Sequence, residues 1–355
     1  MESRKIRVNR ADLGQTAQVT ESLDSPADNQ VLLKVDRIGL SANNISYASA
    51  GDALGYWAHF SDDDTWGVVP VWGFGTVVES ANPAIAVGEN VFGFLPMASH
   101  AVLTPDAVTD VTFSDESSQR SALHPWYKRY YRCGNDPLFD EELMDTQPVL
   151  WALFMTGWMM AEELRGEVDC VFISSASSKT ALSLAWSLAH CGEPVNTVGL
   201  TSSANRGFVE SLGVYSKVVT YDDIQVDPTV TKAAYVDIAG NAQVTSDAHV
   251  ALGDKLKDSV LIGATHRAPA AEPLPMPGPA PRFFFIPNVA EEKAAANGFN
   301  NYHQDFAAEW KRFAAWANTW LSFDHGSGAD AVERGYQACF AGGLPANSAM
   351  VFTWD

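Results

Sequence analysis

Apolar residues occur in short alternating runs over residues 1 to about 110, a pattern that is typical of β-strands. In residues 30–40 the side chains alternate between two faces, as in a half-buried strand. Two further strands are predicted at residues 73–79 and 90–94, with glycine and proline at the turns between them. We therefore expect a β-rich domain in residues 1–149.

After residue 149 the pattern changes to strands and helices in alternation. A strongly apolar helix is predicted at residues 150–164, and an apolar strand at residues 171–173 leads through a polar loop into an amphipathic helix. Further strands are predicted at residues 194–200, 217–220, 233–238 and 258–262. This alternation predicts an α/β domain with a doubly wound parallel sheet of the Rossmann type in residues 150–267.

Three other stretches complete the predicted organisation. Residues 112–148 are polar and aromatic, and we interpret them as an irregular insertion that could act as a lid. The proline-rich residues 266–287 predict an extended crossing segment. Beyond them, Asp305 could cap a helix, and residues 350–353 predict a strand that returns to the first sheet. Residues 268–355 are therefore assigned to the first domain.

Composition and charge limit the classes of partner. The chain has 355 residues and a formal charge of −20, from 23 Lys and Arg against 43 Asp and Glu. Such a charge repels phosphate backbones and anionic lipids, so neither nucleic acid nor a membrane is expected as a partner. No secretory signal is evident near the N-terminus, and a cytoplasmic location is expected. The four cysteines lack metal-binding spacing, so we expect buried core cysteines and no metal site.

The polar loop at residues 174–180 is the strongest candidate for a ligand site. It leads into a helix, whose first N–H groups and dipole favour an anion. Lys179 either pairs with a phosphate or projects into solvent. A dinucleotide fingerprint has glycines in such a loop, whereas serine and alanine stand here, so a serine-rich helix cap that binds nothing is the alternative. The predicted anion contacts are Ser175, Ser177, Ser178, Lys179 and Thr180.

Several segments, in their order and spacing, resemble the medium-chain dehydrogenase/reductase superfamily, in its zinc-independent, quinone-oxidoreductase-like branch. They are QVLLKVDRIGLSANN, VPVWGFGTVVES, VGENVFGFLPMASHAVL, CVFISSASSKTALSLAWSLAH, GFVESLGVYSKVVTYDD, AAYVDIAGN and DSVLIGATH. Within the superfamily, the combination of SANNISY, SSASSKTA and GLTSSAN is similar to a group known only as a domain of unknown function. The resemblance implies a GroES-like β-rich domain, a Rossmann domain and a nicotinamide cofactor. The cysteine and histidine zinc ligands of alcohol dehydrogenases have no counterpart around Asn43 and Asn44.

The resemblance also implies where each part of the cofactor lies. The tip of the second Rossmann strand, where a carboxylate would hold the ribose of NADH, has hydroxyls, an amide and a guanidinium, which favour the 2′-phosphate of NADPH. The alternative is that Arg206 is only an exposed charge at a helix start. The cofactor contacts at this tip would be Thr201, Ser202, Asn205 and Arg206, and those around the nicotinamide would be Thr156, Gly240, Gly263 and Thr265.

Candidate catalytic residues follow the strand at residues 30–40. A carbonyl oxygen that gains charge during hydride transfer needs hydrogen-bond donors, which asparagine amides and a phenol provide. The candidates are Asn43, Asn44 and Tyr47, and a tightly hydrogen-bonded turn is the alternative for all three. His266 either contacts substrate or is an ordinary surface or core histidine. An aromatic wall or lid around the substrate would comprise Tyr56, Trp57, Tyr130 and Tyr131.

The sequence thus predicts an NADPH-dependent, metal-independent reductase of an activated C=C or C=O bond in a fairly apolar substrate. Two alternatives stay open. One is non-redox carbonyl chemistry on the same fold, such as C–C cleavage or a lyase step, and the other is an NADPH-binding sensor or structural protein without turnover. A homodimer or homotetramer is expected from the resemblance.

Overall fold

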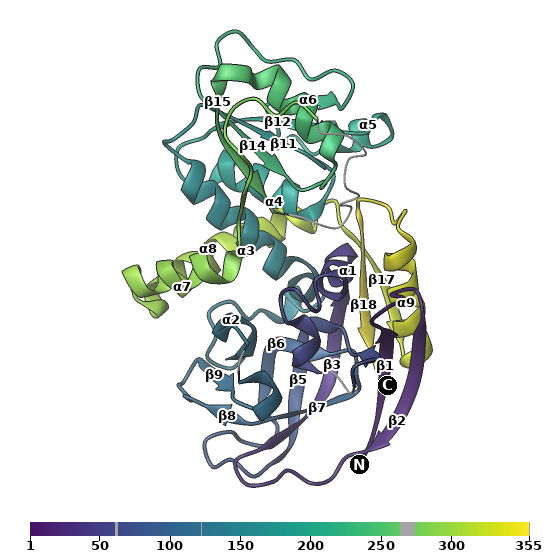
Figure 1. The fold of residues 1–355 in the computed structure, drawn as a ribbon. Helices are drawn as coiled ribbons and strands as arrows, with labels where there is room; N and C mark the ends of the chain where they lie inside the picture. The colour runs from purple at the N-terminus through teal and green to yellow at the C-terminus, as the bar shows by residue number, and fades with distance from the viewer. Residues whose placement is uncertain (61–62, 122, 263–273, 355) are drawn as a thin grey trace. The chain divides into compact units, whose positions relative to one another are not determined.

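Two units make up the chain in the computed structural model, which describes residues 1–60, 63–121, 123–262 and 274–354 (Figure 1). Unit 1 comprises Met1–Trp151 and Ala294–Asp355, and unit 2 comprises Ala152–Lys293. The sequence analysis ended the second domain at residue 267, whereas unit 2 continues to Lys293. The reason is that β16 (Arg282–Phe283) pairs with β15 (Leu256–Leu261) and extends the sheet of unit 2.

Unit 1 is built on a nine-stranded sheet in the order β17-β18-β3-β5-β6-β10-β9-β8, in which β7 also pairs with β3. Its strands are β3 (Val31–Leu40), β5 (Pro70–Ser80), β6 (Asn90–Pro96), β7 (His100–Leu103), β8 (Pro105–Asp106), β9 (Thr112–Asp115), β10 (Arg129–Arg132), β17 (Ser322–Ser327) and β18 (Ser348–Thr353). A smaller sheet joins β1 (Glu2–Asn9), β2 (Thr16–Ser22) and β4 (Trp66–Gly67). The strands predicted within residues 30–40, 73–79 and 90–94 are all present as β3, β5 and β6.

The last strand returns to the first sheet, as the sequence predicted. β18 pairs antiparallel with β3 through Met350 and Leu40, and β17 pairs parallel with β18. The helices of unit 1 are α1 (Ala42–Ser49), α2 (Pro125–Lys128), α8 (Phe299–Ala317) and α9 (Ala329–Ala341), together with short 3₁₀ turns at Tyr56–His59, Ser118–Arg120 and Glu141–Leu143. Helix α3 (Thr146–Leu164) begins in unit 1 and continues into unit 2, and α7 (Ile286–Asn297) runs from unit 2 into unit 1.

Three sequence-based expectations about unit 1 and its borders are wrong. Residues 112–148 are not an irregular lid, because β9 and β10 pair with each other and add to the nine-stranded sheet. Helix α8 begins at Phe299 and not at Asp305, since its apolar face extends back to the buried Tyr302. Regular structure also resumes before residue 287, because Pro287 occupies the first turn of α7, where a missing N–H is tolerated.

Unit 2 contains a six-stranded parallel sheet in the order β13-β12-β11-β14-β15-β16. This is the Rossmann order, with the first strand at the centre, as the alternation of strands and helices predicted. The remaining elements are β11 (Cys170–Ile173), α4 (Lys179–His190), β12 (Asn196–Thr201), α5 (Ser203–Ser211), β13 (Lys217–Thr220), β14 (Ala233–Asp237), α6 (Ala242–Leu252) and a 3₁₀ turn at Gly253–Lys255.

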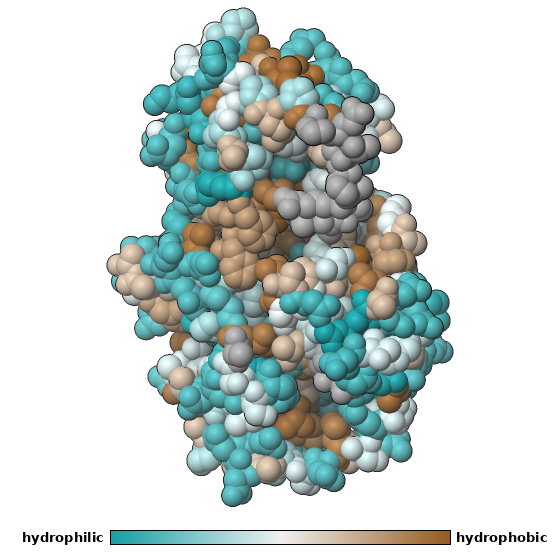
Figure 2. All heavy atoms as spheres, viewed as in Figure 1, coloured by the Kyte–Doolittle hydropathy of each residue, from teal (hydrophilic) through white to brown (hydrophobic). Residues whose placement is uncertain are grey.

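The core of unit 2 lies between the sheet and its helices (Figure 1). Phe172, Leu200 and Tyr235, from β11, β12 and β14, are buried together with Leu252 of α6. Helices α3 and α4 approach closely at Gly157, where an added Cβ would overlap the backbone of Leu184. The close approach of the two helices therefore requires glycine at position 157. On the viewed face of each unit, hydrophilic residues predominate and apolar residues form smaller groups (Figure 2).

Candidate functional site

The loop between β11 and α4 turns tightly at a residue that is not glycine. Ser175 has φ 51°, in the left-handed region, where an L-residue is disfavoured by about 1–2 kcal/mol. The Ser178 amide donates to the Ser175 carbonyl over 2.7 Å, and the Ala176 amide donates to the Leu200 carbonyl over 3.0 Å. Ser175 therefore adopts the backbone conformation that glycine would favour at this position of a dinucleotide loop.

Side chains from neighbouring elements hold this turn. The Tyr221 hydroxyl accepts from the Ser175 amide over 3.2 Å, and the Tyr215 hydroxyl donates to the Ala176 carbonyl over 3.0 Å. The Asn205 amide group donates to the Ser177 hydroxyl oxygen over 3.1 Å. Asn205 and Tyr221 follow β12 and β13, whereas Tyr215 lies just before β13. The loop is therefore braced by residues from around both of these strands.

The start of α4 keeps donors open for an anion. Ser178 is the N-cap, and its hydroxyl accepts from the Ala181 amide over 3.2 Å. The amides of Ser177 and Thr180 have no hydrogen-bond partner among the residues that the structure describes, and both residues are partly exposed. Lys179, the first residue of α4, is also partly exposed. Open amides at the positive end of the helix dipole suit a phosphate group.

The carboxyl end of β12 leads into the N-cap of α5 and then to the cationic side chain of Arg206. Ser202 is the N-cap of α5, and Thr201 is buried, so neither presents a fully free side chain. Arg206 is exposed and its Nε donates to Glu210 over 2.8 Å, one turn further along α5. Its two terminal nitrogens make no hydrogen bond within the described part of the chain. Arg206 thus forms an ion pair with Glu210 through Nε and keeps its two terminal nitrogens available for a ligand.

Of the predicted nicotinamide contacts, only two lie in the described residues. The Thr156 hydroxyl donates to the Ala152 carbonyl of its own helix over 2.8 Å. Gly240, after β14, has φ 66° and donates its amide to the Asp237 carboxylate over 3.0 Å. Three predicted contacts, Gly263, Thr265 and His266, lie outside the described residues.

In unit 1, the three candidate catalytic residues of α1 have different roles. Asn44 completes a capping box with Ser41 and donates to the Pro70 carbonyl over 3.3 Å, so its polar groups are used in the fold. For Asn44 these contacts favour the alternative, a tightly hydrogen-bonded turn, over a catalytic role. Asn43 is half-buried and hydrogen-bonds to the side chain of Tyr47. The Tyr47 hydroxyl also accepts from Trp72 Nε1 over 3.1 Å.

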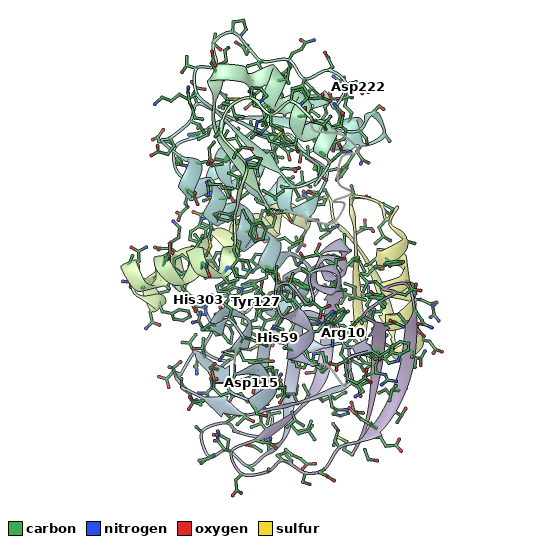
Figure 3. All side chains as sticks on the ribbon, viewed as in Figure 1. Arg10, His59, Asp115, Tyr127, Asp222 and His303 are labelled. Carbon is green, nitrogen blue, oxygen red and sulfur yellow. The ribbon has the colours of Figure 1, made fainter. Side chains whose placement is uncertain are left out.

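Tyr47 belongs to a buried group of rings that also contains Tyr56, His59 and Tyr127. Figure 3 labels two of its members, His59 and Tyr127, which lie near each other in unit 1. The hydroxyls of Tyr56 and Tyr127 are 2.7 Å apart, and the rings of His59 and Tyr127 have centroids 5.7 Å apart. Burial, followed by the neighbouring Tyr56, raises the pKa of Tyr47 well above its usual range, and burial raises the pKa of Tyr56 to about 12. These phenols stay protonated, so they act as donors and not as bases.

His59 has an unusual position in this group. It is 1% exposed, and its Nδ1 has no hydrogen-bond partner among the described residues. Burial, and then the charge of Arg120, lowers the pKa of His59 to about 3. Arg120 in turn forms a buried ion pair with Asp115, with 2.7 Å between nitrogen and oxygen. The imidazole is therefore neutral and enclosed by aromatic rings.

The predicted aromatic wall of Tyr56, Trp57, Tyr130 and Tyr131 does not form as one surface. Trp57 is buried against Gly51 and Gly67, where an added Cβ would overlap its ring. Tyr130 stacks on Phe113 within the sheet, and its hydroxyl donates to the Phe94 carbonyl over 2.6 Å.

Tyr131 is buried between Trp151 and His303. Trp57, Tyr130 and Tyr131 are each packed in the core of unit 1, which does not favour the lid or wall prediction for these three residues.

Sequence analysis missed Trp72, His59 and Tyr127 as neighbours of Tyr47. For Tyr127 a signal was present: His124 is followed by Pro125, and proline at the first helical position indicates a helix start. A short helix places the Tyr127 hydroxyl beside that of Tyr56. The sequence analysis interpreted this segment as irregular and selected Tyr130 and Tyr131 from it instead. No comparable signal marks Trp72, whose partner Tyr47 is distant in sequence.

Among the described residues, no three His, Cys, Asp or Glu side chains are grouped in a way that could hold a metal ion. Within the described ranges, none of the helices combines the length and apolar character that crossing a membrane needs.

Solved structures with this fold cover nearly the whole chain. CurA from Vibrio vulnificus in complex with NADPH is 13% identical, with a TM-score of 0.61 over 99% of each chain. A mutant form of enoyl thioester reductase from Candida tropicalis is 12% identical, and a putative NADPH:quinone reductase from Bacillus thuringiensis is 10% identical; each has a TM-score of 0.62 over 100% of both chains. The fold is that of the medium-chain dehydrogenase/reductase superfamily, with a GroES-like and a Rossmann unit.

A family model shows the family to which the chain belongs. The model described as "Protein of unknown function (DUF2855)" matches residues 38–345. The chain therefore belongs to this family, as its resemblance to an uncharacterised group predicted. No curated protein matches the sequence.

Proposed function

We propose that this protein is an NADPH-dependent oxidoreductase that reduces an activated C=C or C=O bond, of the enone, quinone or aldehyde type, in a fairly apolar substrate without a metal. The observation that carries the proposal is the β11–α4 loop. It lies at the ends of parallel strands in a sheet of Rossmann order, turns at the left-handed Ser175 and leaves the Ser177 and Thr180 amides open. A site of this construction favours a pyrophosphate.

The residues around the loop fit NADPH as the cofactor. The open amides at the start of α4 would bind the pyrophosphate. The β12 tip, residues 201–206, has no carboxylate, and the free terminal nitrogens of Arg206 would bind a 2′-phosphate. Of the similar structures, CurA was solved with NADPH, and the Bacillus protein is named a putative NADPH:quinone reductase.

On the substrate side, Tyr47 and Asn43 are the donors that the proposal uses. When bound, NADPH supplies a hydride, and the substrate oxygen then gains negative charge. The Tyr47 hydroxyl accepts from Trp72, so its own proton can be donated to that oxygen, and the Asn43 amide lies beside it. Fixed donors of this kind stabilise developing charge. Water or Tyr47 would supply the final proton.

Two assays test the proposal. NADPH binding is followed by the fluorescence of the reduced nicotinamide, and NADPH oxidation is measured with a panel of enones, quinones and aldehydes. We expect saturable binding and oxidation with at least one substrate class, and EDTA should leave the rate unchanged. NADPH binding without NADPH oxidation over a broad substrate panel would favour the sensor alternative. A protein that binds neither NADPH nor NADH would refute the proposal.

The preference for NADPH over NADH is tested at Arg206. In Arg206→Ala we expect NADPH to bind about ten-fold more weakly, because a charged hydrogen bond to the 2′-phosphate is lost, while NADH binding stays the same. Arg312→Ala is the matched control, since Arg312 is also an exposed helix arginine, paired with Glu309 on α8. Equal NADPH affinity in wild type and Arg206→Ala would remove Arg206 from the site.

A further inference from the structure

Asp237, the last residue of β14, is a buried carboxylate to which several elements donate hydrogen bonds. It is 5% exposed. Its Oδ1 accepts from the Ser174 hydroxyl over 2.8 Å and from the Gly240 amide over 3.0 Å. The Thr245 hydroxyl, on α6, lies 3.1 Å from Oδ2. Donors from the β11–α4 loop, the turn after β14 and α6 thus meet at one side chain.

The Ser174 hydroxyl extends this arrangement. Ser174 is 0% exposed, and its oxygen accepts from the amides of Ile238 and Ala239 over 2.8 and 2.9 Å while it donates to Asp237. The Ser174 amide itself donates to the Val236 carbonyl over 3.0 Å. Two sets of hydrogen bonds therefore join the first residue of the β11–α4 loop to the turn at residues 238–240. The Ser174 hydroxyl binds two amides of the turn directly, and Asp237 accepts from both Ser174 and Gly240.

The proposed function assigns the first of these segments to NADPH, and the sequence predicted Gly240 of the second segment as a contact of the same cofactor. The loop that begins at Ser174 would bind the pyrophosphate, and the turn that ends at Gly240 would lie beside the nicotinamide. We infer that Asp237 is a positioning residue, which acts through Ser174 and Gly240 to hold both cofactor-binding segments at a fixed separation. The inference rests on the proposed function for its ligand, and on the hydrogen bonds above for its geometry.

A second aspartate of unit 2, Asp169, separates the number of hydrogen bonds from their place in the fold. Asp169 is exposed and immediately precedes β11, at the opposite end of the strand from Ser174. It accepts from the Thr231 amide, the Thr231 hydroxyl and the Lys232 amide over 3.0, 2.6 and 3.1 Å. If only the number of accepted hydrogen bonds matters, loss of either carboxylate should have similar consequences, whereas a positioning role predicts an effect on NADPH for Asp237 alone.

The test compares NADPH dissociation constants of wild type, Asp237→Ala, Asp237→Asn and Asp169→Ala. Asp237→Ala is expected to weaken NADPH binding about ten-fold or more, because it leaves buried donors unpaired in both segments. Asp237→Asn should bind NADPH within about three-fold of wild type, since its amide oxygen still accepts from Ser174 and Gly240. Asp169→Ala should bind NADPH like wild type, although its melting temperature falls.

Amide hydrogen exchange in the cofactor-free protein tests the geometry independently of any ligand. Asp237→Ala should exchange faster than wild type at Ile238, Ala239 and Gly240 and in residues 174–178, whereas Asp237→Asn and Asp169→Ala should not. If the exchange behaves in this way and wild type binds no dinucleotide, the proposed function fails and the coupling of the two segments stands. Unchanged exchange and NADPH affinity in folded Asp237→Ala, or equal losses in Asp169→Ala, would overturn the inference.

Discussion

The Tyr47 hydroxyl group is buried, accepts a hydrogen bond from Trp72 and keeps its own proton for donation. Its pKa lies well above the usual range because of burial and the nearby Tyr56, so the phenol stays neutral at any physiological pH. These properties support the proposal that Tyr47 donates to a substrate oxygen, whereas the side chain of its neighbour Asn44 caps α1 and donates to the Pro70 carbonyl.

Tyr47→Phe tests this role. We expect kcat for NADPH oxidation to fall about 10²–10³-fold, since one donor to the developing charge is lost. The NADPH dissociation constant should be unchanged. Tyr130→Phe serves as the control, because it also removes a buried hydroxyl from unit 1, at the cost of about 1–3 kcal/mol in stability, but should leave kcat unaffected. Wild-type kcat in Tyr47→Phe would exclude Tyr47 as the donor.

His59 provides a pH test at the same scale. The pKa of His59 is about 3 in the folded protein, against an ordinary value of 6.5. Between these two pH values the unfolded chain therefore binds a proton that the folded chain does not. The free energy of unfolding should therefore fall as pH drops below about 6.5, by about 1 kcal/mol at pH 5.5, and should show no His59 contribution above pH 7.5.

His59→Phe should remove this part of the pH dependence, because phenylalanine keeps a ring in the same aromatic surroundings. Urea unfolding of both proteins at pH 7.5 and pH 5.5 measures the difference. The same loss of stability between the two pH values in wild type and variant would show that His59 is not the titrating group.

At the scale of elements, the β11–α4 loop has a serine with positive φ where a dinucleotide fingerprint has glycine, and neighbouring side chains hydrogen-bond to it. Ser175 has φ 51°, and Tyr221, Tyr215 and Asn205 hold the turn around it. Loss of glycine from the fingerprint therefore does not open or flatten the turn. The loop keeps a left-handed residue at its turn although the glycines of the fingerprint are absent.

Substitutions at Ser175 separate backbone conformation from side-chain chemistry. Ser175→Gly should keep NADPH binding and change stability by less than about 1 kcal/mol, since relief of the left-handed conformation offsets the added chain entropy. Ser175→Val should lower stability by about 1–2 kcal/mol or more, because a β-branched residue strongly disfavours positive φ. Thermal and urea unfolding measure both. A Val variant as stable as the Gly variant would contradict the left-handed turn.

Periodicity predicted most elements, since apolar spacing is a local property. β13 lies at Lys217–Thr220, where the sequence placed it, and β3, β12 and β14 differ from their predicted ranges by two residues or fewer at either end. The aromatic strands β9 and β10 were missed because Tyr130 and Tyr131 were interpreted as lid residues. Their pairing depends on the nonlocal contact between Tyr130 and Phe113.

The site was predictable only where its chemistry lies within one segment. The loop at residues 174–180 and the capped start of α5 follow from local sequence. The Tyr56–Tyr127 and Ser174–Asp237 contacts join residues 71 and 63 positions apart, and tertiary packing alone brings them together. For the same reason sequence analysis could not distinguish Asn43, beside Tyr47, from Asn44, whose side chain is used in the capping box.

At the scale of the whole molecule, the charge of −20 is the dominant property. Like charges on a folded surface repel each other, and salt screens them over a Debye length of about 10 Å at 0.1 M and about 3 Å at 1 M. We therefore expect the half-unfolding temperature to rise by several degrees between 0.05 M and 1 M NaCl, with KCl acting equally. A half-unfolding temperature that is flat or falls with salt would contradict this expectation.

The proposed function requires that the start of α4 binds the pyrophosphate of NADPH, and a crystal structure of the protein with saturating NADPH would show whether it does. We expect pyrophosphate oxygens within about 3 Å of the Ser177 and Thr180 amides, with the 2′-phosphate at Arg206. NADPH bound elsewhere, or a crystal in which these amides face only solvent despite saturating NADPH, would contradict it.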